Sequence, residues 1–190
     1  MLQRAIFLDR DGVINRVIMK EGKPYSPRKL SDFQLTDGIK GVLDHLKEAG
    51  FLLIVVTNQP DISRGLITWD ALEAIHNLIR PELPVDDIIV CPHDDADECD
   101  CRKPKPGLII QAQEKYQLDL GKIVMVGDSA KDIECARNAG CGGSILVQTG
   151  NGLTAEKMLA EKGIVPGRIA VDFYDAAHLL TGKMAIAGQA

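Results

Sequence analysis

The stretch Ala5-Ile6-Phe7-Leu8-Asp9-Arg10-Asp11-Gly12 decides the fold of this 190-residue chain. It begins as a short apolar run, typical of a buried strand, and ends in an acid with a glycine soon after. Two carboxylates two residues apart suit divided labour, in which one attacks phosphorus and the other protonates the leaving oxygen. Such close like charges also call for a cation, and Mg²⁺ prefers oxygen ligands. Taken alone, the motif is explained equally well as a solvated acidic turn.

Strand and helix patterns alternate along the rest of the chain. Further strands are predicted at Phe51–Thr57, Asp87–Val90, Ile123–Val126, Ser144–Gln148 and Arg168–Val171. Helices are predicted at Asp37–Ala49, Thr68–Leu83, Leu108–Tyr116, Ser129–Ala139, Thr154–Lys162 and Phe173–Leu180. The long segments Gly12–Thr36 and Cys91–Gly107 are expected to be loops. This alternation predicts an α/β fold with a Rossmann-like parallel sheet covered by helices on both faces. We expect one domain over residues 1–182 and a flexible tail at 183–190.

Composition and charge narrow the class of protein. The net charge of −5 provides no basic bulk surface, so no nucleic-acid partner is predicted. No apolar run is long enough to span a bilayer, and the N-terminus lacks the pattern of a secretion signal. The sequence therefore predicts a cytoplasmic protein without a membrane partner. A monomer is expected.

Two more predicted strand ends carry groups suited to a phosphate ester. Thr57, Asn58 and Gln59 follow the second strand, where a hydroxyl and backbone N–H groups hold a phosphoryl oxygen, although these are also common turn residues. Lys103 lies between Arg102 and a proline just before a helix, where a fixed ammonium neutralises a transferring phosphoryl group. An ordinary helix entry is the competing interpretation of that lysine.

A fourth strand end carries Gly127-Asp128-Ser129, with Asp132 one turn into the next helix. Asp128 is a candidate metal ligand. Asp132 is predicted to accept the Ser129 N–H as half of a capping box, which is a purely structural role. Because the carboxyl ends of parallel strands meet at one edge, the four motifs are expected to share a single crevice.

The cysteines are unevenly distributed. Cys91, His93, Cys99 and Cys101 place four soft ligands within eleven residues, and a chain without a secretion signal is a poor candidate for disulfides. This spacing predicts a closed, structural Zn²⁺ site, with reduced cysteines on an ordinary loop as the alternative. The intervening acids, Asp94–Glu98, are expected to repel one another unless such a clip orders them. Zinc is expected to set the geometry of Arg102 and Lys103 without taking part in the chemistry.

The four strand-end motifs together resemble the haloacid dehalogenase superfamily of phosphotransferases. The resemblance covers residues 5 to 132 and implies Asp9 as the nucleophile and Asp11 as the general acid and base. It implies that Thr57 and Lys103 stabilise the transferring phosphoryl group. Mg²⁺ would be held by the Asp9 carboxylate, the Asp11 backbone carbonyl and Asp128.

The cysteine loop followed by Cys-Arg-Lys-Pro looks like one subfamily, the D-glycero-D-manno-heptose 1,7-bisphosphate 7-phosphatases and the related histidinol-phosphate phosphatases. Its members lack a large cap domain. The resemblance implies a small-molecule phosphate ester as substrate, with heptose bisphosphate first and histidinol phosphate or another sugar phosphate as the alternative. Substrate contacts are expected from Asn58, Gln59, Arg102 and Arg64.

The chain departs from this subfamily at Pro60-Asp61, where Ser-Gly is usual. Asp61 is expected to contact a hydroxyl or an amine, or to face solvent, and an amine would favour histidinol phosphate. His45, His76 and His178 lie within helical patterns and are interpreted as surface or core-edge residues. A non-catalytic binding module and a nucleic-acid end-processing phosphatase are remote alternatives. The intact motif carboxylates oppose the first, and the negative charge opposes the second.

Overall fold

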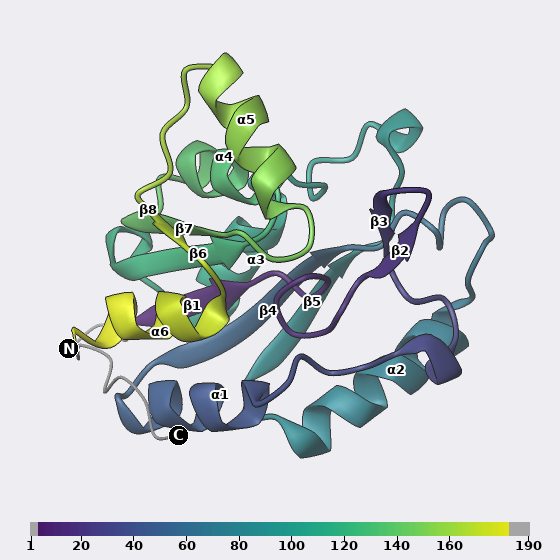
Figure 1. Ribbon diagram of the computed structural model, residues 1–190, viewed down its shortest axis with the longest axis horizontal. Coiled ribbons are helices and arrows are strands. Elements are labelled where there is room, and N and C mark those ends of the chain that lie inside the picture. Colours follow the sequence, from purple (N-terminus) through teal and green to yellow (C-terminus); the bar gives the residue numbers. More distant parts are fainter. Residues whose placement is uncertain (1–3, 183–190) are drawn as a thin grey trace.

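The computed structural model describes residues 4–182, so the tail expected at 183–190 lies outside the described part. A six-stranded sheet forms the centre of the molecule (Figure 1). All its pairings are parallel, in the order β5-β4-β1-β6-β7-β8. The strands are β1 (Ala5–Leu8), β4 (Leu52–Asn58), β5 (Asp87–Cys91), β6 (Ile123–Gly127), β7 (Gly143–Val147) and β8 (Arg168–Ala170). The predicted parallel α/β fold is confirmed.

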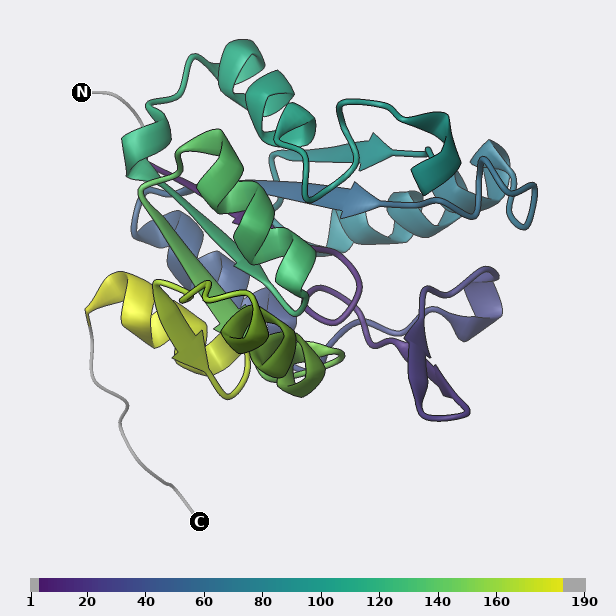
Figure 2. The same ribbon diagram turned by 90° about the horizontal axis from the view of Figure 1, so that it is seen from above.

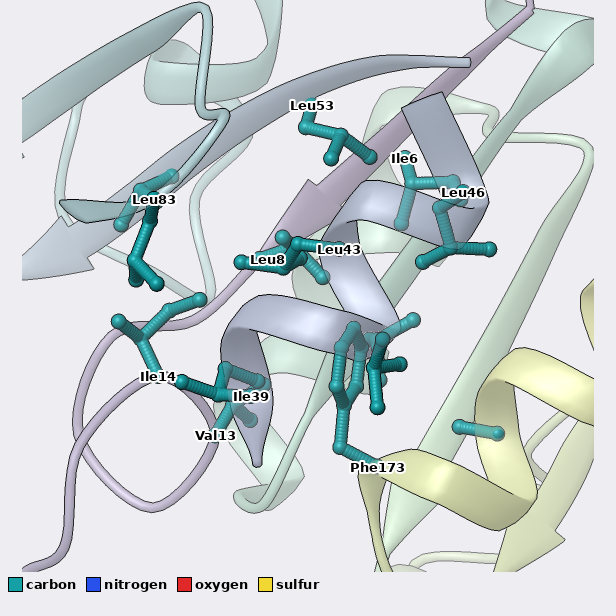
Figure 3. Close-up of a cluster of buried hydrophobic side chains, with 14 of the residues drawn as sticks. Ile6, Leu8, Val13, Ile14, Ile39, Leu43, Leu46, Leu53, Leu83 and Phe173 are labelled. Atoms are coloured by element: carbon teal, nitrogen blue, oxygen red, sulfur yellow. The ribbon is translucent and has the colours of Figure 1, made fainter. Parts of the chain in front are cut away.

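Helices cover both faces of this sheet. They are α1 (Ile39–Glu48), α2 (Trp69–Glu82), α3 (Gly107–Tyr116), α4 (Ala130–Ala139), α5 (Gly152–Glu161) and α6 (Phe173–Thr181). Because side chains alternate along a strand, β1 contributes to two separate cores. Ile6 and Leu8 pack in the core formed with α1, α2 and α6 (Figure 3), while Ala5 and Phe7 pack in the core formed with α3 and α4. Both faces of β1 are therefore fully buried, which explains its uninterrupted apolar run.

The segment Gly12–Thr36, which the sequence predicts to be a long loop or flap, is more ordered than that prediction and is called the flap below. It contains an antiparallel hairpin, β2 (Ile18–Lys20) with β3 (Lys23–Tyr25), and a short 3₁₀ turn at Leu30–Asp32. No residue of these two strands is fully buried, so the sequence has no alternating apolar pattern that would predict the hairpin. The turn between the strands, Glu21-Gly22, has positive φ at both residues (49° and 74°), as a type I′ hairpin turn requires.

The hairpin projects from the rest of the molecule beside the carboxyl ends of the strands (Figures 1 and 2). The loop after β5 rises from the same edge. These two segments take the place of a large cap domain. β1 lies between β4 and β6, at the point where the strand order reverses, which is where ligands bind in open parallel sheets.

The five cysteines, all within residues 4–182, form no disulfide with one another. Within residues 4–182, no helix combines the length and the apolar character needed to cross a membrane.

Candidate active site

Asp9 follows β1 directly and stands at the centre of the site. Its backbone N–H donates to Val126 O at 2.9 Å, which ties the end of β1 to β6. Its Oδ1 accepts from the Arg10 backbone N–H and from Lys103 Nζ, both at 2.8 Å. Its Oδ2 has no hydrogen-bond donor among the described residues. Burial and the neighbouring Asp132 carboxylate raise the pKa of Asp9 to about 7, although Lys103 opposes the shift.

Lys103 reaches this carboxylate from the loop after β5. Its ammonium donates to Asp9, to Asp132 Oδ1 at 2.5 Å and to Val56 O at 2.9 Å, so all three protons are used. The side chain is 3% exposed. Burial lowers the pKa of Lys103, but the two carboxylates outweigh it and the net pKa is raised. Lys103 is therefore a fixed positive charge at the floor of the site.

Asp132 has a larger role than the predicted helix cap. Its Oδ2 accepts from the Ser129 N–H at 3.0 Å, so the predicted capping contact is confirmed. Its Oδ1, however, holds Lys103, and the residue is fully buried. The motif spacing places the acid correctly, but it does not indicate the partner, because Lys103 comes from the loop after β5.

Asp128 lies beside Asp9 and is almost fully buried. Its Oδ2 accepts from the Asn151 N–H at 2.8 Å, and its Oδ1 has no donor within residues 4–182. Burial and the Asp9 carboxylate raise the pKa of Asp128 well above its usual range. Two glycines make room for it, because a Cβ on Gly12 or Gly150 would lie 2.2 or 2.1 Å from Asp128 Oδ2. Both glycines also have positive φ.

These carboxylates fit a divalent cation. Asp9, Asp128 and Asp132 offer oxygen atoms within 4.8 Å of one another. Asp132 is committed to Lys103 and Ser129, whereas Asp9 and Asp128 each keep one oxygen free. Two adjacent buried acids with raised pKa values mark negative charge that the surrounding protein does not neutralise. Hard cations such as Mg²⁺ are bound through such oxygens.

Asp11 also lines the site, but its carboxylate is held by surrounding donors. Arg10 Nη2 donates to both oxygens at 3.0 Å, and Asn15 Nδ2, Ser26 Oγ and Gln59 Nε2 donate at 2.8–2.9 Å. Burial raises the pKa of Asp11, but the Arg10 charge and these donors outweigh it, so the net pKa is lowered. Both carboxylate oxygens of Asp11 therefore already have hydrogen-bond donors.

The Thr57-Asn58-Gln59 group ends β4 next to Lys103. Thr57 is buried, and its Oγ1 accepts from Gln59 Nε2 at 2.9 Å. The Asn58 amide exchanges two hydrogen bonds of 3.0 Å with the Lys103 backbone, and so fixes that residue from the side. Gln59 is 2% exposed and faces Asp11 and Thr57. Asn58 lines the cavity described next, while Gln59 lies behind it.

A cavity of about 480 Å³ opens above these residues. Its floor contains Asp9, Asp11, Lys103 and Asp128, and its rim includes hairpin residues 23–26. Arg102 lines the cavity, with its side chain 11% exposed, and it donates to Asp95 Oδ1 at 2.7 Å. The four predicted strand-end motifs thus meet at one hollow.

Arg64 and Asp61 lie further out than the sequence suggests. Arg64 pairs with Asp94 at 2.7 Å and does not line the cavity. Asp61 accepts from Arg28 Nε at 2.6 Å and lies 3.4 Å from Arg64. Asp61 therefore joins the flap to the loop after β4, and its side chain is only 13% exposed. The sequence does not predict the pairing of Asp61 with Arg28, because Arg28 lies in a segment without hydrophobic periodicity.

The loop after β5 gathers Cys91, His93, Cys99 and Cys101. Their ligand atoms lie within 4.8 Å of one another, with Sγ–Sγ separations of 3.1–3.7 Å and His93 Nδ1 3.3 Å from Cys101 Sγ. A tetrahedral ion with bonds of about 2.3 Å would set its sulfurs about 3.7 Å apart. Burial raises the pKa of Cys91 well above its usual range, so a cation is needed to hold it as a thiolate. The cluster is a possible metal site.

Three of the acidic residues between these ligands have partners that offset their mutual repulsion. Asp94 and Asp95 pair with Arg64 and Arg102, and Asp97 accepts from Ser63 Oγ at 2.6 Å. The loop is therefore tied to the segment after β4 by charge pairs as well as by the cysteine cluster. The sequence predicts the cluster but not these partners.

The fold and the site define a hydrolase of phosphate esters built on a parallel sheet. Residues 2–137 match the model of the haloacid dehalogenase-like hydrolases, and residues 100–176 match a second, HAD-hydrolase-like model. The chain belongs to the haloacid dehalogenase-like hydrolase family.

Individual relatives resemble the chain over most of its length. A D-glycero-beta-D-manno-heptose-1,7-bisphosphate 7-phosphatase of Vibrio cholerae is 37% identical, over 95% of this chain and 97% of its own. The enzyme of that name from Yersinia pestis is 37% identical over 80% of this chain and 84% of its own. The crystal structure of the D,D-heptose 1,7-bisphosphate phosphatase from B. bronchiseptica, complexed with magnesium and phosphate, has a TM-score of 0.82 and 34% identity. That comparison covers 94% of this chain and 98% of the other.

Proposed function

We propose that the protein hydrolyses D-glycero-D-manno-heptose 1,7-bisphosphate at the 7-phosphate, through an aspartyl-phosphate on Asp9. The observation that carries this proposal is the asymmetry of the Asp9 carboxylate. Its Oδ1 is fixed by Lys103 and the Arg10 N–H, while its Oδ2 has no donor among the described residues and Asp9 lines the cavity. A carboxylate anchored by one oxygen and free at the other is oriented for attack on phosphorus. The substrate is inferred from the named relatives.

The first step forms the Asp9–phosphorus bond and breaks the phosphorus–oxygen bond of the ester. Asp11 gives its proton to the leaving alkoxide, and Lys103 stabilises the charge on the transferring group together with Thr57. Water then attacks phosphorus while Asp11 takes up its proton, which releases phosphate and free Asp9. When bound by Asp9, Asp128 and the Asp11 carbonyl, Mg²⁺ would neutralise charge between carboxylate and phosphate.

Asp11 must be protonated before it can act as the acid, whereas its donors hold it ionised in the free protein. A phosphate dianion placed beside it raises the pKa of such a carboxyl group. We infer that substrate binding supplies the proton affinity that Asp11 lacks in the free enzyme. The same donors then favour the carboxylate for the second step.

The rest of the substrate is proposed to contact Arg102 and Asn58, both of which line the cavity. Gln59 would act from behind, through Thr57 and Asp11. Arg64 would have to leave Asp94 to reach a ligand. Asp61 is occupied by Arg28 and Arg64, so it no longer argues for an amine-bearing substrate such as histidinol phosphate.

The cysteine cluster is proposed to hold one structural Zn²⁺, which closes the loop that carries Arg102 and Lys103. All four ligands come from the protein, as in structural rather than catalytic zinc sites. A cytoplasmic monomer without nucleic-acid or membrane partners is the accompanying prediction.

Phosphate release from a panel of esters tests the proposal. Heptose 1,7-bisphosphate should give the highest kcat/KM, above heptose 7-phosphate, other sugar phosphates and histidinol phosphate. Equal and weak rates on all of them would contradict the proposed substrate while leaving the phosphatase chemistry intact. An Asp9→Asn variant that still turned over would contradict the chemistry itself.

A further inference from the structure

Arg10 is the largest fully buried side chain in the described part of the protein. Its guanidinium holds Asp11 through Nε at 3.3 Å and Nη2 at 3.0 Å. Its Nη1 lies 3.3 Å from His76 Nε2. A guanidinium is planar, so a partner on Nη1 fixes the orientation of the Nε and Nη2 pair as well.

His76 has a single state that satisfies these contacts. Arginine has no acceptor, so His76 Nε2 must accept from Arg10 and carries no proton. The proton therefore sits on Nδ1, which donates to Glu73 Oε1 at 3.2 Å. Burial and the Arg10 charge lower the pKa of His76 to about 4, which keeps the ring neutral near pH 7. A protonated ring would place two donors against each other at the Arg10 contact.

The chain of contacts continues to the surface of α2. Glu73 is 44% exposed and pairs with Arg80 at 2.8 Å. Four side chains thus form a continuous line from α2 to the floor of the cavity, in the order Glu73, His76, Arg10 and Asp11. Nothing in the reaction proposed above uses the first two members. Glu73 and His76 can therefore influence Asp11 only through Arg10.

We propose that His76 is a positioning residue for Asp11, acting through Arg10. The inference rests on the proposed function, because it assigns His76 to the proton-transfer half of that reaction. Loss of the His76 acceptor would free Nη1 in a buried site, and the guanidinium would turn to find another partner. Asp11 would then lose the Arg10 Nε and Nη2 donors, and its carboxyl group would no longer be oriented toward the leaving oxygen. Asp9, Lys103 and Asp128 make no hydrogen bond or ion pair with His76 in the described part of the chain, and would keep their arrangement.

Two substrates separate this role from simple core filling. A sugar phosphate has a poor leaving group that needs the proton of Asp11, whereas p-nitrophenyl phosphate releases a stable phenolate without one. Misplacement of Asp11 should slow the sugar phosphate far more than the nitrophenyl ester. A general loss of packing should slow both alike.

The experiment compares wild type with His76→Leu, which keeps bulk but has no acceptor, and His76→Gln, which keeps an acceptor for Arg10. For His76→Leu we expect kcat on the best sugar phosphate to fall about 10- to 100-fold, with less than about a threefold fall on the nitrophenyl ester and little change in KM. For His76→Gln we expect recovery to within about threefold on both substrates. Glu82→Ala, an exposed acid on the same helix, is the matched control and should behave as wild type.

Equal losses on both substrates, or no loss in His76→Leu, would overturn the positioning role. If His76→Leu does not fold, Glu73→Ala tests the same chain from its exposed end and should show the same substrate dependence, more weakly. Nitrogen-15 NMR of the wild-type ring gives a readout that needs no turnover, and the Nδ1–H neutral form is expected. An Nε2–H ring would overturn the inference even in an active phosphatase. A wild type inactive on all esters would instead contradict the proposed function.

Discussion

Lys103 Nζ lies 2.5 Å from Asp132 Oδ1, and both side chains are almost completely buried. Asp132 also caps α4 through Ser129, so one carboxylate anchors a helix and fixes the position of a lysine from another loop. The Lys103 ammonium in turn fixes one oxygen of Asp9. The position of the proposed nucleophile therefore depends on a charge pair that lies beneath it.

Replacement of Lys103 by Met should damage both activity and stability. Removing one partner from a buried ion pair costs about 3–5 kcal/mol, because Asp132 and Asp9 would keep uncompensated charge. Loss of a charge that stabilises the transferring group should lower kcat by about 10²- to 10³-fold. Urea unfolding and phosphate release check the two effects. Lys122→Met, at an exposed lysine, should change neither. Near-normal turnover in Lys103→Met would contradict the role given to the lysine.

The cysteine loop should bind one zinc ion per chain. Cys101→Ser removes one of four ligands, and we expect metal content to fall and hydrogen exchange in residues 91–103 to rise. Activity should fall together with the metal content, because Arg102 and Lys103 lie directly after Cys101 and line the cavity. Cys141→Ser, which changes a cysteine outside the cluster, should retain zinc and activity. Full activity and unchanged stability after chelation of the zinc would argue against a structural role.

The neutral state of His76 predicts a pH dependence of stability. Its folded pKa of about 4 lies below the ordinary 6.5, so between these values the unfolded chain binds more protons. Stability from this group is therefore complete above about pH 6.5 and is lost as the pH falls towards 4, by about 2–3 kcal/mol in all. His76→Gln should flatten this part of the stability curve in urea unfolding at several pH values. His45→Gln, at a partly buried histidine of α1, should leave it unchanged. A curve identical in all three proteins would show that His76 titrates normally.

Asp61→Gly should loosen the flap without touching the reacting groups. The change removes the 2.6 Å contact with Arg28, a partly exposed pair of a kind worth about 0.2–1 kcal/mol. We expect KM for the sugar phosphate to rise by at most about fivefold, with kcat retained. Lys40→Ala removes an exposed pair with Asp44 within α1, does not touch the cavity lining and should leave KM unchanged. A large fall in kcat would mean that Asp61 takes part in the chemistry.

The sequence predicts the fold well where burial is two-sided. β1, β4 and β6 are apolar on both faces, so each appears as an uninterrupted run, and the motif at each end is placed with it. The sequence does not predict the β2–β3 hairpin, because its strands are three residues long and none of their residues is fully buried. Periodicity carries no information about such an element.

The site was predictable to the extent that it depends on strand ends. Asp9, Asn58 and Asp128 line one cavity because parallel strands end at one edge, and Lys103 reaches it from the loop after β5. Partnerships across the fold were not predictable, since no local pattern links Arg10 to His76 or Asp132 to Lys103. Arg10 lies between two acids in the sequence, and a cation next to a buried strand must find partners inside the protein, but its charge alone does not identify those partners.

Asp9 is expected to become phosphorylated during turnover. Quenching the enzyme during turnover of its best substrate, reducing with borohydride and mapping the peptides would convert an aspartyl-phosphate into homoserine at the modified position. The account predicts homoserine at position 9 in the wild type, and none in Asp9→Asn or without substrate. Homoserine at another acid, or steady turnover with Asp9 never modified, would contradict it.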